Sequence, residues 1–360
     1  MTSKGGKKAF IATLTIPPTS TPRGTIRLMA GPSNIPDRPS HAPDRERVAS
    51  AGRRAQRVLT GLALAGVLSV AYMAFEAQWV RCRRADLPVP GLPLPWSGLT
   101  VLHLSDVHAG TFMSNARSLA KVVRWAEAAG PDLVFLTGDI VGDPKRSKTC
   151  LELLGRLHPP LGMFAVTGNH EYGLSKAPLA RSRDAAGLWT EAGVTLLSDS
   201  CVTLPAREGT SVLICGADYV SGGFGLPAEG SVLHAAGRGP GHEAPAAAGA
   251  GGPPAAIFPI LLIHDPPAAD SPLTAFPLVF AGHTHGGQLR VPGPSGLTPV
   301  HMKDDVYLGG VHRWGAGTLV VSRGIGTSFL PLRLLTRPEA TLWRLVYTSS
   351  EGPAQADRST

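Results

Sequence analysis

Short apolar runs alternate with amphipathic segments along the chain from about residue 99. The runs contain few polar positions, which is typical of strands that are buried on both faces. They cover residues 99–104, 133–136, 163–166, 195–197, 212–215, 257–263, 278–281, 318–322 and 342–347. Segments with helical spacing lie between several of them, at 114–129, 150–157 and 179–192. This alternation predicts an α/β fold.

A longer apolar run, residues 58–75, carries no charged side chain. It is at the lower limit of length for a helix that crosses the ~30 Å hydrocarbon core of a membrane, and we expect residues 58–80 to be a transmembrane anchor or an export signal. Arginines on both sides disfavour the alternative, a buried core helix. More of them precede the run than follow it, which favours a cytoplasmic N-terminus and a globular part outside the cytoplasm. Arg53-Arg54 resembles part of a twin-arginine export signal, and the absence of a small-residue cleavage site before Glu76 favours an uncleaved anchor.

Proline and glycine content defines the other segments. Residues 81–98 contain several prolines and predict an extended connector to a globular domain at 99–347. Within that domain, residues 221–254 consist largely of glycine, alanine and proline and predict a flexible surface insertion. The polar residues 348–360 predict a frayed tail.

The net charge of +8 arises entirely at the N-terminus. Residues 1–57 carry 11 lysines and arginines against 3 acidic residues, and the rest of the chain carries 23 of each. The basic segment lacks sustained periodicity, and we expect it to be disordered. Because the globular part is neutral overall, we expect no dedicated nucleic-acid partner.

Four cysteines are present, at positions 82, 150, 201 and 215. Their spacing fits neither a zinc ribbon nor a redox motif. Cys201 and Cys215 flank an expected hairpin and could pair, but the favoured interpretation is small buried side chains or free thiols. The cysteines therefore leave the redox compartment open.

Polar motifs follow five of the predicted strands. They are Asp106-Val107-His108, Gly138-Asp139, Gly168-Asn169-His170-Glu171, His264 and Gly282-His283-Thr284-His285. Strand ends at one edge of a sheet converge in space, and ligands bind there in α/β folds. The sequence therefore predicts that these side chains meet at one site, with the composition of a two-metal hydrolytic centre.

The residue types suit a pair of cations. Asp106 and His108 are two positions apart and point to the same side of a strand, so both can bind one ion. Asp139 has two carboxylate oxygens and can bridge two ions, and Asn169 offers a neutral oxygen. The remaining candidate ligands are His264, His283 and His285. Mixed oxygen and nitrogen ligands suit Mn, Fe, Zn, Co or Ni.

The five motifs, in this order, resemble those of the calcineurin-like metallophosphoesterase superfamily over about residues 99–347. The segments at 76–79, 286–288, 322–327 and 331–333 further resemble a membrane-anchored or exported bacterial branch of that superfamily. The resemblance implies two packed mixed β-sheets flanked by helices, whereas the periodicity indicates only α/β alternation.

The resemblance also implies roles for the site residues. One metal would be held by Asp106, His108, Asp139 and His285, and the other by Asp139, Asn169, His264 and His283. His170 would assist the leaving group, and Glu171 would orient the His170 ring. Two cations ~3.5–4 Å apart lower the pKa of a bridging water, and the resulting hydroxide would attack phosphorus.

The sequence is compatible with three functions. The favoured one is a phosphodiesterase or pyrophosphatase that acts on lipid-linked or cell-wall substrates at the envelope. A metal-binding scaffold without turnover is disfavoured because His170 and all ligands are present. A nuclease of the same superfamily is disfavoured by the neutral domain and the membrane segment.

Other polar residues have structural interpretations. His103 lies inside a predicted strand and is expected to be a hydrogen-bonded core residue. Asp218 is expected to be a loop carboxylate or a helix cap. For Arg333 a structural role in the C-terminal strands is favoured over substrate contact, since nothing in the sequence indicates its direction.

Overall fold

A single long helix, α1 (Ala42–Gln78), opens the described part of the chain. The computed structural model describes residues 42–110, 115–143, 146–174, 186–221, 256–267, 271–293, 296–300 and 307–349. The described residues divide into two units, one up to Thr60 and the other from Gly61 onward. By its length and composition alone, α1 is long and apolar enough to cross a membrane. Residues 42–57, expected to be disordered, are helical because they are rich in alanine and arginine, which favour helix formation.

The first sheet has six strands in the order β1-β14-β2-β3-β4-β5. Their bounds are Arg81–Pro90 for β1, Thr100–Leu104 for β2, Leu133–Thr137 for β3, Met163–Val166 for β4, Thr195–Leu196 for β5 and Glu339–Thr348 for β14. β2 to β5 are parallel, and β14 is antiparallel to β2. The parallel order directs the ends of β2, β3 and β4 to one edge.

Strand β1 corrects the prediction of a connector at residues 81–98. It pairs with β14 along its whole length, from Arg81 opposite Glu339 to Pro90 opposite Thr348. Leu87 and Val89 are buried in the core between the sheets. β1 is an edge strand, so its two prolines need no donor on the open side. The globular domain therefore begins directly after α1.

The second sheet has the order β12-β13-β9-β8-β7-β6. Its strands are β6 (Ser200–Thr203), β7 (Thr210–Gly216), β8 (Ala256–Leu262), β9 (Leu278–Ala281), β12 (Gly310–Trp314) and β13 (Gly317–Val321). The four central strands are parallel, and the two edge strands are antiparallel to their neighbours. A separate two-stranded hairpin consists of β10 (Arg290–Gly293) and β11 (Gly296–Pro299).

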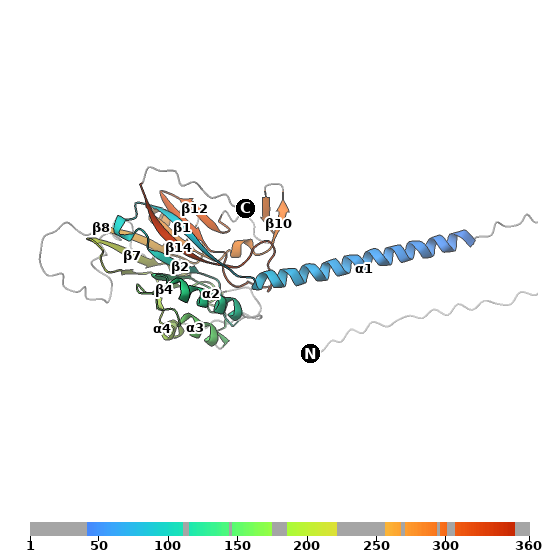
Figure 1. Cartoon of the computed structure of the whole chain (residues 1–360), viewed down its shortest axis with the longest axis horizontal. Helices are drawn as coiled ribbons and strands as arrows, with labels where there is room; N and C mark the ends of the chain where they lie inside the picture. The colour runs from blue at the N-terminus through green and yellow to red at the C-terminus, as the bar shows by residue number, and fades with distance from the viewer. Residues whose placement is uncertain are drawn as a thin grey trace, which may run out of the picture. The chain divides into compact units, whose positions relative to one another are not determined.

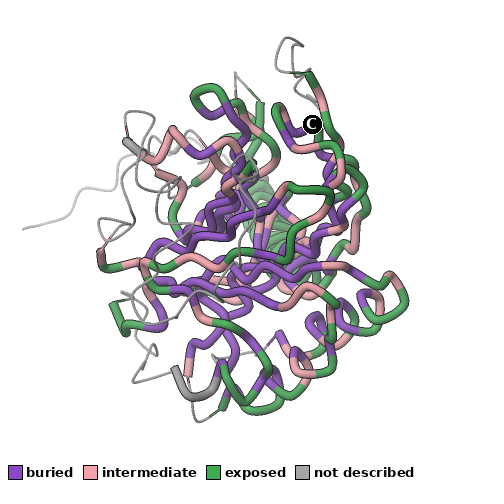
Figure 2. Tube along the Cα trace, turned by 90° about the vertical axis from the view of Figure 1, so that its left-hand side faces the viewer, coloured by how far each residue is buried: buried purple, intermediate pink, exposed green. Residues whose placement is uncertain are grey.

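The two sheets pack face to face around an apolar core. Phe135 and Val166 of the first sheet and Ile214, Phe280 and Val320 of the second belong to this one cluster. The helices α2 (Ala116–Ala129), α3 (Lys148–Leu154) and α4 (Ala186–Glu191) lie along one side of the sheets (Figure 1). The buried segments run through the middle of the domain (Figure 2). The predicted fold class, two packed mixed sheets flanked by helices, is confirmed.

Several expected elements fall partly or wholly outside the described residues. These are most of the N-terminal segment (1–41), nearly all of the insertion at 221–254, and the tail beyond residue 349. The amphipathic helix expected at 179–192 is described only as α4. Three short 3₁₀ helices complete the described elements, at Leu94–Trp96, Pro272–Ala275 and His285–Gly287.

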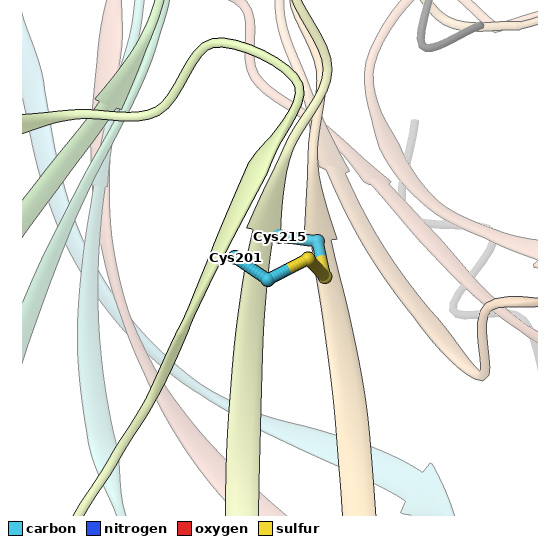
Figure 3. The surroundings of a disulfide bond; sticks show 2 residues. All are labelled: Cys201 and Cys215. Carbon is cyan, nitrogen blue, oxygen red and sulfur yellow. A yellow bond between two sulfur atoms is a disulfide. The ribbon is translucent and has the colours of Figure 1, made fainter. Parts of the chain in front are cut away.

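A disulfide joins Cys201 of β6 to Cys215 of β7 (Figure 3). The two residues are direct partners in the antiparallel register, with their Cα atoms 4.0 Å apart. The favoured interpretation of these two cysteines as free thiols is therefore wrong, because strand pairing brings the two side chains together. Cys82 and Cys150 form no disulfide, as expected.

Candidate metal centre

The ends of five parallel strands bring the predicted motifs together. Asp106 and His108 follow β2, Asp139 follows β3, and Asn169 follows β4. The second sheet contributes His264, which follows β8, and His283 and His285, which follow β9. Because the two sheets face each other, their strand ends meet at one site.

A first donor group consists of Asp106, His108 and His285, all buried. The Nε2 atoms of His108 and His285 are 3.0 Å apart. His285 Nε2 lies 3.4 Å from Asp106 Oδ1, and His108 Nε2 lies 4.0 Å from the same oxygen. Three donor atoms this close together can bind one cation.

A second donor group consists of Asp139, His264 and His283. His283 Nδ1 is 3.0 Å from His264 Nε2, and His264 Nε2 is 3.4 Å from Asp139 Oδ2. The other nitrogen of His264, Nδ1, lies 2.7 Å from the Thr137 carbonyl oxygen. If that nitrogen carries the proton, Nε2 is left with its lone pair toward the site.

Asp139 lies between the two groups. Its Oδ2 is 3.4 Å from His264 Nε2 and 3.7 Å from His108 Nε2. Its other oxygen, Oδ1, accepts a hydrogen bond of 2.8 Å from the backbone N–H of His170. This bond orients the carboxylate so that Oδ2 faces both groups.

Unpaired oxygens show that the residues fit a bound metal. Asp106 Oδ1 and Asn169 Oδ1 are buried and accept no hydrogen bond from the described residues. Such an unsatisfied buried acceptor costs about 1–3 kcal/mol, which a bound cation would offset. The chemistry of the donor set, carboxylate, amide and imidazole, also suits first-row transition metals.

Burial controls the protonation of the histidines. It lowers the pKa of His108 to about 3 and, together with the nearby charge of His108, holds the pKa of His285 well below its usual range. Burial has the largest single effect on the pKa of His264 and lowers it, but the charge and hydrogen bond of Asp139, the charge of Asp106 and the Thr137 carbonyl together raise that pKa to about 10. A protonated His264 thus pairs with the Asp139 carboxylate. A cation bound at Nε2 would take the place of the proton.

The backbone at the site is strained. Asp106, His108, Asp139, His283 and His285 all have positive φ, between 50° and 69°. Non-glycine residues rarely adopt this conformation, and its cost of order 1–3 kcal/mol each is typical of functional sites. The sharp turns after the strands direct these side chains into one cluster.

Glu171 supports the site through the backbone. Its carboxylate accepts hydrogen bonds of 2.8–2.9 Å from the N–H groups of Asp139, Ile140, Val141 and Gly168. The resemblance implied instead that Glu171 orients the His170 ring. His170 Nδ1 has no hydrogen-bond partner among the described residues, so this expected contact at Nδ1 is absent from them.

His170 is buried beside Asp139 and His108. Its Nε2 is 3.8 Å from Asp139 Oδ2, and its ring packs edge-on against His108 with centroids 4.3 Å apart. His108, Asp139 and His170 also form a third group of closely spaced donors. By distance, His170 fits either a ligand or a group that meets the substrate.

Arg333 is a supporting residue whose role the sequence left undecided. Its side chain is fully buried and donates to the backbone carbonyls of His285, Gly326 and Thr336. It thereby holds His285 against the segment that joins β13 to β14, so the structural interpretation is confirmed. No sequence signal indicated this direction, since the motif around Arg333 has no periodicity.

Two other structural interpretations are also resolved. His103 is buried, and its Nε2 lies 3.0 Å from Thr137 Oγ1, as expected for a core residue. Asp218 is a buried loop carboxylate that accepts hydrogen bonds from the side chains of Thr167, Tyr172 and Ser198. It thus joins the segment after β4 to the second sheet.

Gly168 leaves room for the Asp139 carboxylate. A Cβ added at Gly168 would lie 2.7 Å from the backbone nitrogen of Asp139 and would also overlap its carboxylate. We expect Gly168→Ala to displace Asp139 and to weaken metal binding about 10–100-fold, as loss of outer support commonly does. Metal titration of the purified protein measures this. Gly155→Ala is the matched control, because its Cβ would make only an ordinary contact, 3.5 Å from the Leu151 carbonyl oxygen. Equal metal affinity in the two variants would contradict the prediction.

The family model for calcineurin-like phosphoesterases matches residues 99–287. The chain belongs to the calcineurin-like phosphoesterase family. The matched range starts just before β2 and ends just after His285, so it contains every motif of the candidate metal centre.

Relatives of the calcineurin-like phosphoesterase family support this membership. An uncharacterized metallophosphoesterase of Bacillus subtilis, YkuE, is 30% identical over 72% of this chain and 82% of its own length. The phosphodiesterase YaeI of Escherichia coli is 27% identical over 68% of this chain and 82% of its own length. A transmembrane protein with a metallophosphoesterase domain from Danio rerio is 30% identical over 82% of this chain and 64% of its own length. The chain is accordingly a phosphoester hydrolase.

Proposed function

We propose that this protein hydrolyses phosphodiester or pyrophosphate bonds of envelope or lipid-linked substrates, using two metal ions. The observation that carries the proposal is the position of Asp139, whose Oδ2 lies 3.7 Å from His108 Nε2 and 3.4 Å from His264 Nε2. One carboxylate between two groups of imidazole nitrogens is the arrangement needed to bridge a metal pair. The name of the Escherichia coli relative, a phosphodiesterase, supports the choice of a diester.

Seven side chains would hold the two ions. Asp106, His108 and His285 would bind the first, and Asp139 would bridge it to the second. Asn169, His264 and His283 would complete the second, since Asn169 Oδ1 is buried without a hydrogen bond from the described residues. Bound there, a metal pair lowers the pKa of water and neutralises charge on the phosphoryl oxygens.

His170 would act on the leaving group. Its backbone N–H is held by Asp139 at 2.8 Å, and its Nδ1 is free of hydrogen bonds to the described residues. A neutral ring with its proton on Nδ1 can donate a hydrogen bond to the departing oxygen, and the imidazolium can transfer a proton to that oxygen. Burial lowers the pKa of His170, so its imidazolium is a stronger acid than an exposed one and forms only at lower pH.

The location proposed for the domain is the outer side of a membrane, with α1 as anchor. The apolar residues 58–75 lie on the part of α1 that is exposed along its length. The Cys201–Cys215 disulfide supports the outer side, since such bonds persist mainly in oxidising compartments. A twin-arginine route would suit export of a protein folded around metal.

Hydrolysis by the metal-loaded, full-length protein in detergent tests the proposed function. We expect turnover of bis(p-nitrophenyl) phosphate that is abolished by a chelator and restored by Mn²⁺, Zn²⁺, Fe²⁺, Co²⁺ or Ni²⁺. A panel of lipid pyrophosphates, a soluble monoester and single-stranded DNA then ranks the substrates. Absence of turnover with every metal would sink the proposal in favour of a scaffold, and preferential degradation of DNA would favour a nuclease.

A further inference from the structure

Large apolar side chains are exposed at the C-terminal end of α1 and on the segments joined to it. We call six of them the apolar collar: Phe75 (58% exposed), Trp79 (43%), Leu297 (37%), Val300 (60%), Phe329 (70%) and Leu330 (45%). They come from three segments, namely the end of α1, the β10–β11 hairpin with the residue after it, and the loop that follows β13. Exposed apolar groups gathered from separate segments indicate a contact surface.

Hydrogen bonds join the three segments to one another. The backbone N–H of Arg333 donates to the Met73 carbonyl of α1 at 3.0 Å. The backbone N–H of Arg290, at the start of the hairpin, donates to the Leu334 carbonyl at 3.0 Å. Gln288 fixes the loop, since its Nε2 donates to the Leu330 carbonyl at 3.0 Å. The collar is therefore a defined surface with a backbone connection to the end of the helix.

The loop after β13 contacts α1 at the end of its apolar run. Met73 lies within the apolar run at 58–75, and Glu76 is the first charged residue after it. The Glu76 side chain is only 1% exposed and accepts hydrogen bonds from the backbone N–H groups of Leu335 and Thr336. The domain thus supplies hydrogen bonds to this carboxylate at the position where the helix would leave the hydrocarbon core.

We infer that the apolar collar rests in the surface of the lipid bilayer that α1 enters. The inference rests on the anchoring role proposed above for α1. Because the loop contacts α1 inside its apolar run, Phe329 and Leu330 lie at the depth of the interface between headgroups and acyl chains. Trp79 fits the same level, where tryptophan is enriched in membrane proteins.

The hairpin gives independent support. Leu297 pairs with Pro292, and Val291 pairs with Thr298, so the hairpin has exposed apolar side chains on both faces. No third strand pairs with it among the described residues. A two-stranded ribbon is marginal in water, and lipid on its apolar faces would stabilise it.

Charges beside the collar complement a lipid surface. Arg81 and Arg84, in the first half of β1, are exposed. The Arg337 guanidinium stacks 3.6 Å from the centre of the Trp79 ring. Arginines at this level can reach lipid phosphates while their stems cover apolar groups. Gln288, which holds the loop at Leu330, follows the candidate ligand His285 by three residues. The metal centre is therefore close to this lipid surface.

Depth-dependent quenching in bilayers tests the collar. Single cysteines replace Phe329, Leu62 and Leu94 in the full-length Cys82→Ser chain, in which Cys150 is buried and forms no disulfide. Each is labelled with nitrobenzoxadiazole, and the protein is placed in phosphatidylglycerol-containing nanodiscs with or without doxyl-labelled lipid. Leu62 reports the anchor, and Leu94, 68% exposed, is the matched exposed control outside the collar.

The expected result is quenching of at least twofold at Phe329→Cys and Leu62→Cys, with none at Leu94→Cys. Quenching at Leu62→Cys alone would overturn the collar and leave the anchor standing. Quenching at none of the positions would overturn both. A label at Phe329→Cys that is shielded from water but not quenched by lipid would show that a second copy of the chain covers the collar instead.

Discussion

Replacement of Asp139 by alanine is expected to lower kcat/KM for phosphoester hydrolysis about a thousandfold or more. The estimate follows from the several kcal/mol of transition-state stabilisation that metals supply, at about 1.36 kcal/mol for each factor of ten. Asp139 is the residue within reach of both donor groups, so its loss is expected to weaken both metal positions. Steady-state kinetics beside metal analysis by mass spectrometry measure the two effects.

Asp86→Ala is the matched control for Asp139→Ala. Asp86 is an exposed carboxylate on β1 that pairs with Arg344 at 2.6 Å, remote from the motifs. We expect it to retain metal content and activity within a factor of two. An Asp139→Ala protein that still bound two ions and turned over at the wild-type rate would refute the bridging assignment.

His170→Ala is expected to reduce the rate in a manner that depends on the leaving group. For a diester with a poor alkoxide leaving group, loss of the proton donor lowers kcat by about 10²–10⁴. For bis(p-nitrophenyl) phosphate the loss is much smaller, because p-nitrophenolate departs without protonation. A comparison of kcat for the two substrates, in wild type and variant, isolates the role of the ring.

Metal content separates the two roles that the distances allow for His170. If His170 is a proton donor, the His170→Ala variant keeps its full metal complement. The control variant His158→Ala, at an exposed loop position, keeps both metal and activity. If His170→Ala loses an ion together with its activity on both substrates, His170 is a ligand and the proposed role is wrong.

The central strands could be predicted from sequence because they are buried on both faces. Residues 163–166 and 278–281 were predicted with the bounds that the structure has. Three of the four edge strands of the two large sheets, β1, β6 and β12, were missed for the complementary reason, whereas β5 was predicted at 195–197. β1 contains three charged residues in its first four positions and two prolines near its end, and only its pairing with β14 makes it a strand.

The convergence of the motifs could also be predicted, since strand ends of parallel sheets meet at one edge. Directions of side chains within the cluster could not. Glu171 follows His170 in sequence, yet its carboxylate reaches the backbone of another strand end. Pairing of Cys201 with Cys215 depends on the register of β6 and β7, which turn signals alone do not determine.

Only Trp79 and Val80 separate α1 from β1. Two residues span at most ~7 Å, so a catalytic domain carried by a membrane-embedded α1 has almost no tether. Its encounters with a lipid substrate would then take place in two dimensions, at a local concentration set by the membrane. Turnover of such a lipid would follow its mole fraction in the bilayer and would fall on dilution with inert phospholipid, even at constant bulk concentration.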